Sequence, residues 1–132
     1  MGELRKIVQG TLLENEPMSN HTSYGIGGPA GAYITPKDRC DLAGILKFAN
    51  KYSIETHFVG SGSNLLVADS GIDGIVLTPA KLLTQLEFNN GHVIAESGVM
   101  LGRLVKECIK RNLTGVESMI GVPGTLGGAL VM

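Results

Sequence analysis

Two segments of the chain place hydrophobic residues at helical spacing. In residues 38–52 one face carries Leu42, Ile45, Leu46, Ala49 and Tyr52. In residues 101–112 a clearer stripe carries Leu101, Leu104, Val105, Cys108 and Ile109, opposite a charged face. This spacing predicts two amphipathic helices, each packing one face on a core. Asp38, with Asp41 three residues later, is a candidate N-cap and a weak capping box for the first helix.

Shorter apolar runs, bounded by glycine, proline and asparagine, predict strands around these helices. The expected strands are residues 22–26, 32–35, 56–59, 65–68 and 75–77, with a hairpin of 82–88 and 93–97 around Asn89-Asn90-Gly91. A short helix is expected over Leu4–Leu13, and residues 127–132 have the pattern of the first turns of another. Thr78-Pro79-Ala80 is the expected boundary between two subdomains.

The composition is that of a globular domain, because 43% of the 132 residues are hydrophobic and 17% are charged. A net charge of −1 offers no broad basic field for nucleic acid or an anionic membrane. No apolar run approaches the roughly 20 residues of a membrane span, and the first residues lack the apolar region of a signal peptide. Cys40 and Cys108 stand apart, so metal ligation is not expected. The expected location is the cytoplasm.

Two glycine-rich segments carry the candidate chemistry. The first is residues 60–65 (GSGSNL) and the second is residues 121–128 (GVPGTLGG). Small side chains and accessible backbone N–H groups allow a phosphate to approach closely, and two such segments suit the two phosphates of a dinucleotide. The first segment taken alone also fits a plain turn between strands. The second is harder to explain in that way, because each glycine weakens a helix by about 1 kcal/mol relative to alanine.

Other nucleotide-binding and catalytic motifs are excluded by their context. Residues 25–30 have the spacing of a Rossmann fingerprint, but proline and a predicted strand follow where that fold needs a helix. The chain contains no G-x-x-x-x-G-K-[ST] motif, and its glycine-serine segment does not fit the nucleophile elbow of a serine hydrolase. His21, His57 and His92 are scattered without spaced partners, so a catalytic histidine is not favoured.

The last six residues, Gly127–Met132, are apolar and contain neither a polar tail nor a helix stop. The sequence is therefore expected to be a piece of a longer protein, cut within a helix. Apolar surface exposed by such a cut, at Leu126, Leu130 and Val131, is expected to let the piece associate with itself.

Three linked motifs resemble the amino-terminal part of the UDP-N-acetylenolpyruvoylglucosamine reductases, the MurB-type flavoproteins. They are residues 22–30 (TSYGIGGPA), residues 60–67 (GSGSNLLV), and residues 115–117 (GVE) followed by 121–129 (GVPGTLGGA). The resemblance covers about residues 20–132. It implies an α+β, two-subdomain FAD-binding fold of the vanillyl-alcohol-oxidase (PCMH) type, truncated, and not a Rossmann fold. The implied parts are an extension over 1–19, a first FAD-binding subdomain over 20–79 and an incomplete second one over 80–132, without the substrate-binding domain.

Enzymes of that family reduce the enolpyruvyl ether of UDP-N-acetylglucosamine to UDP-N-acetylmuramate for bacterial cell-wall synthesis, and hydride passes from NADPH through FAD. By resemblance, one side of the FAD pyrophosphate is held by Gly60, Ser61, Gly62, Ser63, Asn64 and Leu65. The other side is lined by Gly121, Gly124, Thr125, Gly127 and Gly128. Ser63 stands in the region where relatives in the wider fold carry a flavin-linked histidine, so noncovalent FAD is expected.

The resemblance also implies what this chain lacks. The family's acid serine, arginine and late glutamate lie beyond the matched segment, so no catalytic residue is expected here and the piece alone is expected to be inactive. Two alternatives stay open. One is a noncatalytic FAD- or nucleotide-binding subunit of a multi-subunit oxidoreductase, and the other is a structural domain without a ligand.

Overall fold

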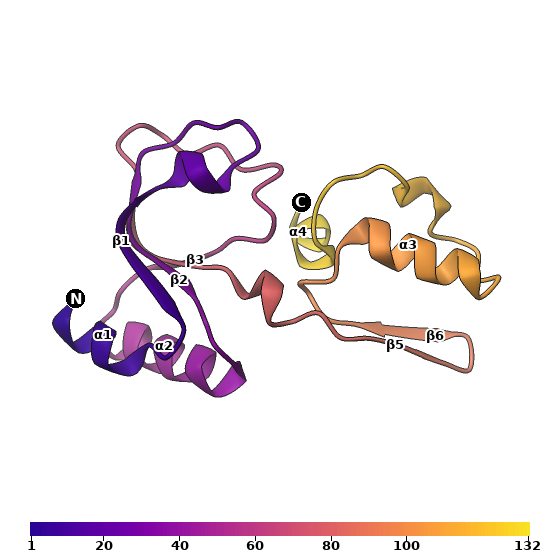
Figure 1. Cartoon of the computed structure of the whole chain (residues 1–132), viewed down its shortest axis with the longest axis horizontal. Helices are drawn as coiled ribbons and strands as arrows, with labels where there is room; N and C mark the ends of the chain where they lie inside the picture. Colours follow the sequence, from indigo (N-terminus) through magenta and orange to yellow (C-terminus); the bar gives the residue numbers. More distant parts are fainter.

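The computed structural model describes all 132 residues, and they form two units that we call the first unit (residues 1–79) and the second unit (residues 80–132) (Figure 1). The elements are α1 (Gly2–Ile7), β1 (Thr11–Pro17), η1 (Met18–His21), β2 (Pro29–Thr35), α2 (Arg39–Lys51), β3 (Thr56–Phe58), β4 (Ile72–Leu77), η2 (Pro79–Lys81), β5 (Leu86–Asn89), β6 (His92–Ala95), α3 (Leu101–Lys110), η3 (Glu117–Met119) and α4 (Leu126–Val131). No helix combines the length and the apolar character needed to cross a membrane.

The first unit is a four-stranded sheet with helices on one face and loops on the other (Figure 1). The strand order is β1-β2-β4-β3, with β1 antiparallel to β2 and the other pairs parallel. Neighbouring residues of a strand point to opposite faces, so the sheet supports two cores. The core beneath the helices contains Leu4, Ala32, Ile34, Ile45, Ala49, Ile75 and Leu77. The core beneath the loops contains Met18, Ala30, Tyr33, Val59, Val67 and Val76.

Residues 1–19, which the sequence suggests as an extension, are built into this sheet. After α1 ends at Ile7, the chain forms β1, whose residues alternate between exposed and half-buried as they pair with β2. The helix expected over residues 4–13 is therefore wrong beyond Ile7. Gly10 lies at the junction, where a Cβ atom would come within 2.1 Å of the Thr35 carbonyl oxygen. Glycine is required at position 10, because the start of β1 and the end of β2 approach each other closely there.

α2 begins at the predicted position, but its first turn is not a reciprocal capping box. Asp38 Oδ1 accepts the N–H of Asp41 at 2.8 Å, as an N-cap does. The buried Asp41 carboxylate instead accepts three other backbone N–H groups, from Gln9 at 3.0 Å, Gly10 at 2.9 Å and Lys37 at 2.8 Å. Asp41 therefore joins the α1–β1 connection to the start of α2.

Three expected strands are confirmed as β2, β3 and β4 with shifted ends, and two are wrong. Residues 22–26 form a turn in which Thr22 Oγ1 donates to the Ile26 carbonyl at 2.9 Å, and Gly25 has φ 66°. Residues 65–68 pair with no strand, although their exposure alternates as it does in a strand, with Val67 in the core and Leu66 exposed. A single buried residue satisfies the apolar pattern there without a ladder of backbone hydrogen bonds.

The second unit confirms the predicted hairpin and the predicted helix. β5 and β6 pair antiparallel around residues 90 and 91, although β5 begins at Leu86 and not at residue 82, and α3 packs its apolar stripe above them (Figure 1). Val99, Leu104 and Cys108 are buried between the two, with Phe88 packed against them. α4 starts at Leu126, which confirms a helix at the end of the second glycine segment.

Candidate cofactor-binding site

The two glycine segments meet where the first and second units face each other. A Cβ atom on Gly60 would lie only 2.4 Å from Thr125 Oγ1, so the two backbones approach closely at this point. A Cβ atom on Gly124 would lie 3.5 Å from Ser63 Oγ. In Figure 1 the start of α4 accordingly lies beside the loop that follows β3. The structure thus brings together segments that the sequence separates.

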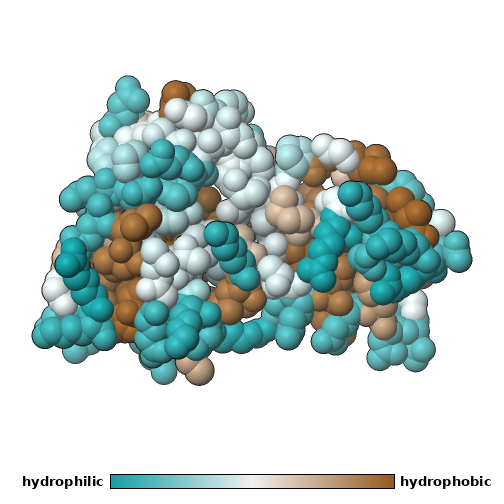
Figure 2. Space-filling view, viewed as in Figure 1, coloured by the Kyte–Doolittle hydropathy of each residue, from teal (hydrophilic) through white to brown (hydrophobic).

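The first segment presents a run of free donors. The backbone N–H groups of residues 60–65 donate no hydrogen bond to another part of the chain. The Ser61 and Ser63 hydroxyls bond each other at 2.8 Å, and Asn64 Nδ2 donates to Met132 Sδ at 3.2 Å. Figure 2 shows pale, weakly polar surface over the loop side of the first unit. Successive unpaired N–H groups are suited to hold phosphate oxygens, so the residues present fit a phosphate-bearing cofactor.

The first segment rests on residues 18–28. Gly62 is buried at φ +69°, and a Cβ atom there would lie 1.9 Å from the His21 carbonyl oxygen. The Ser23 N–H donates to the Gly62 carbonyl, and the Gly28 N–H donates to the Ala68 carbonyl, each at 3.0 Å. The chain's own backbone therefore requires glycine at position 62.

His21 has a supporting position that its place in the sequence does not indicate. Its ring stacks on Tyr33 with the centroids 3.8 Å apart, and its Nε2 lies 3.0 Å from Glu16 Oε1. Hydrogen bonds from Asn20 and then His21 lower the pKa of Glu16, while burial raises the pKa of Tyr33. These contacts fix the His21 backbone beneath Gly62. η1 brings His21 back to Glu16 locally, whereas Tyr33 joins them only through the pairing of β1 with β2, so no local sequence pattern reveals the whole cluster.

The second segment is anchored on the turn of residues 97–99 that precedes α3. The Gly127 N–H donates to the Ser97 carbonyl and the Leu126 N–H donates to the Val99 carbonyl, each at 2.8 Å. A Cβ atom on Gly127 would lie 2.8 Å from the Ser97 Cβ. Thr125 is buried and its hydroxyl caps α4, so its side chain is turned into the protein.

The remaining expected site residues, Gly121, Gly128 and Leu65, differ in how closely other parts of the protein approach them. Gly121 has φ +81° and no atom within 4 Å of its Cβ position. Gly128 has only Thr125 Oγ1 nearby, 3.3 Å from its Cβ position. Leu65 is half-buried and packs against the core beneath the loops, so its backbone is the part that remains available to the site. Gly121 is not in contact with the first segment, whereas Gly124 and Thr125 are.

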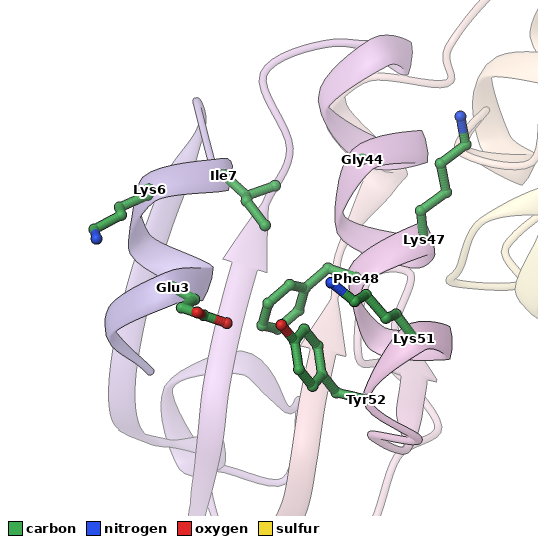
Figure 3. A pocket seen from close by; sticks show the side chains of 8 residues that line it. All are labelled: Glu3, Lys6, Ile7, Gly44, Lys47, Phe48, Lys51 and Tyr52. Atoms are coloured by element: carbon green, nitrogen blue, oxygen red, sulfur yellow. The ribbon is translucent and has the colours of Figure 1, made fainter.

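A hollow of the surface lies elsewhere. It is an open groove of about 480 Å³ between α1 and α2 and contains no residue of either glycine segment. Figure 3 shows Ile7 and Phe48 between the two helices with Tyr52 and Lys51 beside them, while the side chains of Lys6 and Lys47 extend outward. Nothing in the groove donates from a buried position, so the glycine segments remain the candidate site.

Comparison with known proteins agrees with this geometry. Residues 30–132 match the FAD binding domain family. The chain is 39% identical over 130 residues to the UDP-N-acetylenolpyruvoylglucosamine reductase of Bacillus licheniformis, a match that covers 98% of this chain and 43% of that protein. The crystal structure of UDP-N-acetylenolpyruvylglucosamine reductase (MurB) from Thermus caldophilus superposes with a TM-score of 0.66 at 27% identity, covering 92% of this chain and 41% of that one.

A more distant likeness concerns the fold alone. p-Cresol methylhydroxylase superposes with a TM-score of 0.61 at 15% identity, covering 85% of this chain and 24% of that one. The chain spans less than half the length of the relatives it matches.

Proposed function

Because the chain belongs to the FAD binding domain family, we propose that it is the amino-terminal, cofactor-binding part of a UDP-N-acetylenolpyruvoylglucosamine reductase. The family match and the structural neighbours confirm the FAD cofactor and the PCMH-type fold, distinct from a Rossmann fold, that the sequence motifs imply. The observation that carries the proposal is the meeting of the two glycine segments, with unpaired N–H groups on one of them.

In this proposal the two segments hold the FAD pyrophosphate from two sides. The backbone N–H groups of residues 60–65 donate to its oxygens, and the backbone of residues 121, 124, 127 and 128 lines the opposite wall. Thr125 acts indirectly, because its buried hydroxyl caps α4 and its side chain spaces the second segment from Gly60. Leu65 contributes its backbone, while its side chain secures the loop on the core.

Bound FAD supplies hydride transfer from NADPH to the enolpyruvyl group of a UDP-N-acetylglucosamine ether, which yields UDP-N-acetylmuramate. The residues of this chain bind and orient the cofactor for that reaction. We propose that the proton donor and the UDP-sugar contacts lie in the remaining part of such a protein, because this chain matches only 43% of the length of a relative. Ser63 offers no nitrogen for attachment, so we propose noncovalent FAD that acid releases intact.

Replacement of Gly128 by alanine tests the site. In this proposal the Cβ would enter the space of the pyrophosphate, and its only neighbour within the protein is Thr125 Oγ1 at 3.3 Å, while alanine favours the helix by up to about 1 kcal/mol. We expect Gly128→Ala to leave the urea midpoint nearly unchanged and to weaken FAD binding at least tenfold, measured by quenching of flavin fluorescence. Gly102→Ala in the first turn of α3, with nothing within 4 Å, is the matched control. Equal FAD affinity in the parent, Gly128→Ala and Gly102→Ala would show that the second segment is not part of the FAD site.

An activity assay separates the proposal from its alternative. NADPH oxidation that depends on the enolpyruvyl substrate is expected of a longer protein that contains this segment and not of the 132-residue chain. A longer protein that binds FAD but oxidises no NADPH with this substrate would instead be a noncatalytic FAD-binding subunit. We also propose a cytoplasmic location, where FAD, NADPH and nucleotide sugars occur, and fractionation of cells tests it.

We further propose that the 132-residue chain associates with itself through the apolar face of α4. Leu130, Val131 and Met132 are 79%, 89% and 79% exposed, whereas Leu126, which is expected from the sequence to share this surface, packs against the core of the second unit. Sedimentation velocity over a range of concentrations is expected to show dimers or larger species that Leu130→Lys suppresses. A concentration-independent monomer would exclude this association.

A further inference from the structure

One ion pair joins the two units. The guanidinium of Arg39, the first residue of α2, contacts Glu96 Oε1 just after β6. The other ion pairs each lie within a single unit, as Arg5 with Glu14 does at 2.7 Å. The Glu96 side chain is only 16% exposed, and its second oxygen accepts the Gln85 N–H at 2.7 Å. The Gln85 N–H, which belongs to the same unit, therefore holds the Glu96 carboxylate in place independently of Arg39.

Glu96 stands directly beside the backbone that carries the second glycine segment. The next residue, Ser97, accepts the Gly127 N–H at 2.8 Å. The residue after it, Gly98, packs against the connector between the units, where a Cβ atom would lie 2.6 Å from the Ala80 carbonyl oxygen. Glu96 is thus separated from the start of α4 by one residue, Ser97, and one hydrogen bond.

We propose that Arg39 is a positioning residue, which holds the second unit against the first in the orientation that brings the two glycine segments together. Two contacts at separate points fix a relative orientation better than one. The Gly60–Thr125 contact is one of them, and the Arg39–Glu96 pair, which joins α2 to the end of β6, is the other. The consequence for FAD rests on the proposed function, whereas the orientation of the units does not.

The orientation is measured first, without any ligand. Spin labels at Lys47→Cys on α2 and Lys106→Cys on α3, in a Cys40→Ser background, report the distance between the units by pulsed electron resonance; Cys108 is buried. We expect a narrow distribution that Arg39→Ala broadens and Arg39→Lys largely restores. Arg5→Ala, which removes an equally exposed arginine from a pair inside the first unit, is the matched control. An unchanged distribution in Arg39→Ala, or equal broadening in Arg5→Ala, would overturn the proposal.

The cofactor is measured next, with FAD itself as the probe. Arg39→Ala and Glu96→Gln are each expected to raise the Kd for FAD about fivefold at low salt, with little further loss when combined, while the urea midpoint stays unchanged. The difference from the parent is expected to shrink in 1 M salt. An unaltered Kd alongside a broadened distribution would refute the effect on the cofactor. A parent chain that binds no FAD would count against the proposed function, and the distance measurement would still decide the role of Arg39.

Discussion

The contact between Gly60 and Thr125 makes a quantitative prediction about how the two segments are joined. A Cβ atom on Gly60 would lie 2.4 Å from Thr125 Oγ1, 3.3 Å from its Cγ2 and 3.4 Å from its Cβ. Gly60 does not have a positive φ, so alanine introduces a steric conflict without backbone strain. Either Thr125 rotates and loses its cap on α4, or the two segments move apart.

The size of the effect follows from these two routes. Loss of the cap costs about 1 kcal/mol, and overpacking costs about 1–3 kcal/mol, so Gly60→Ala should destabilise the chain by about 1–3 kcal/mol. Thr125→Ala alone should cost about 1 kcal/mol. In the double variant the two Thr125 atoms that crowd the new methyl group most are gone, and the Thr125 Cβ lies at an ordinary contact distance of 3.4 Å. Its total loss should stay near 1 kcal/mol, which gives a coupling of at least about 1 kcal/mol.

Urea unfolding of the four proteins, followed by circular dichroism, measures this coupling. The m-values should agree, so that the midpoints report stability alone. Gly102→Ala, with nothing within 4 Å, gives the background effect of a glycine-to-alanine change. Strictly additive losses would show that the two residues do not touch in solution, and the argument for a site formed by both segments would lose its basis.

Other positions give predictions of different kinds. Asp41→Asn should lower the free energy of unfolding in urea by about 2–3 kcal/mol, because the asparagine amide cannot accept all three N–H groups. Asp38→Asn should cost little, because asparagine is an equally good N-cap. Equal losses in the two variants would contradict this prediction. Gly62→Ala should cost about 3 kcal/mol or more even without FAD, because its Cβ would meet the His21 carbonyl at φ +69°, and a normal apo midpoint would refute that. Lys110 and Arg111 lower the pKa of Glu107 to about 2, so the charged form stabilises the fold above pH 4.5 and that contribution disappears as pH falls through about 2. The gap in thermal midpoint between the parent and Glu107→Gln should therefore narrow below pH 4.5, and a constant gap would exclude the ion pairs as its cause.

Elements fixed by local periodicity could be predicted from the sequence. α2, α3 and the hairpin each have a repeat of apolar residues and a clear end signal, such as Asp38 before α2 or Asn90-Gly91 between β5 and β6. β1 could not be predicted, because the alternation of exposed and half-buried residues along it arises from its pairing with β2. The apolar run at residues 65–68 does not show from the sequence whether it is a strand or a loop, because this depends on distant residues. Val67 fills a core formed by distant residues, and no neighbouring strand provides backbone partners.

The candidate site shows the same division between local and distant causes. Glycine-rich composition indicates close backbone approach, but it does not say what approaches. At Gly60, Gly62 and Gly127 the atom that a Cβ would meet belongs to the protein itself, at 2.4, 1.9 and 2.8 Å. These three glycines are required by the fold before any cofactor is considered, so their presence alone is no measure of phosphate binding.

Gly121 and Gly128 differ, because a Cβ at Gly121 meets nothing within 4 Å and one at Gly128 meets only a hydroxyl at 3.3 Å. Gly121 still needs glycine for its φ of +81°, since other residues are strained there. Gly128 has neither a positive φ nor a backbone neighbour to exclude a side chain, and it lies in a helix that alanine would favour. Gly102 in α3 is also a helical glycine without a neighbour, so this freedom alone does not indicate a ligand; Gly128 differs because it lies beside Thr125, which contacts Gly60 of the first segment. Gly128 is therefore the position where the fold and the cofactor make separable demands, and its replacement is the most direct test of the site.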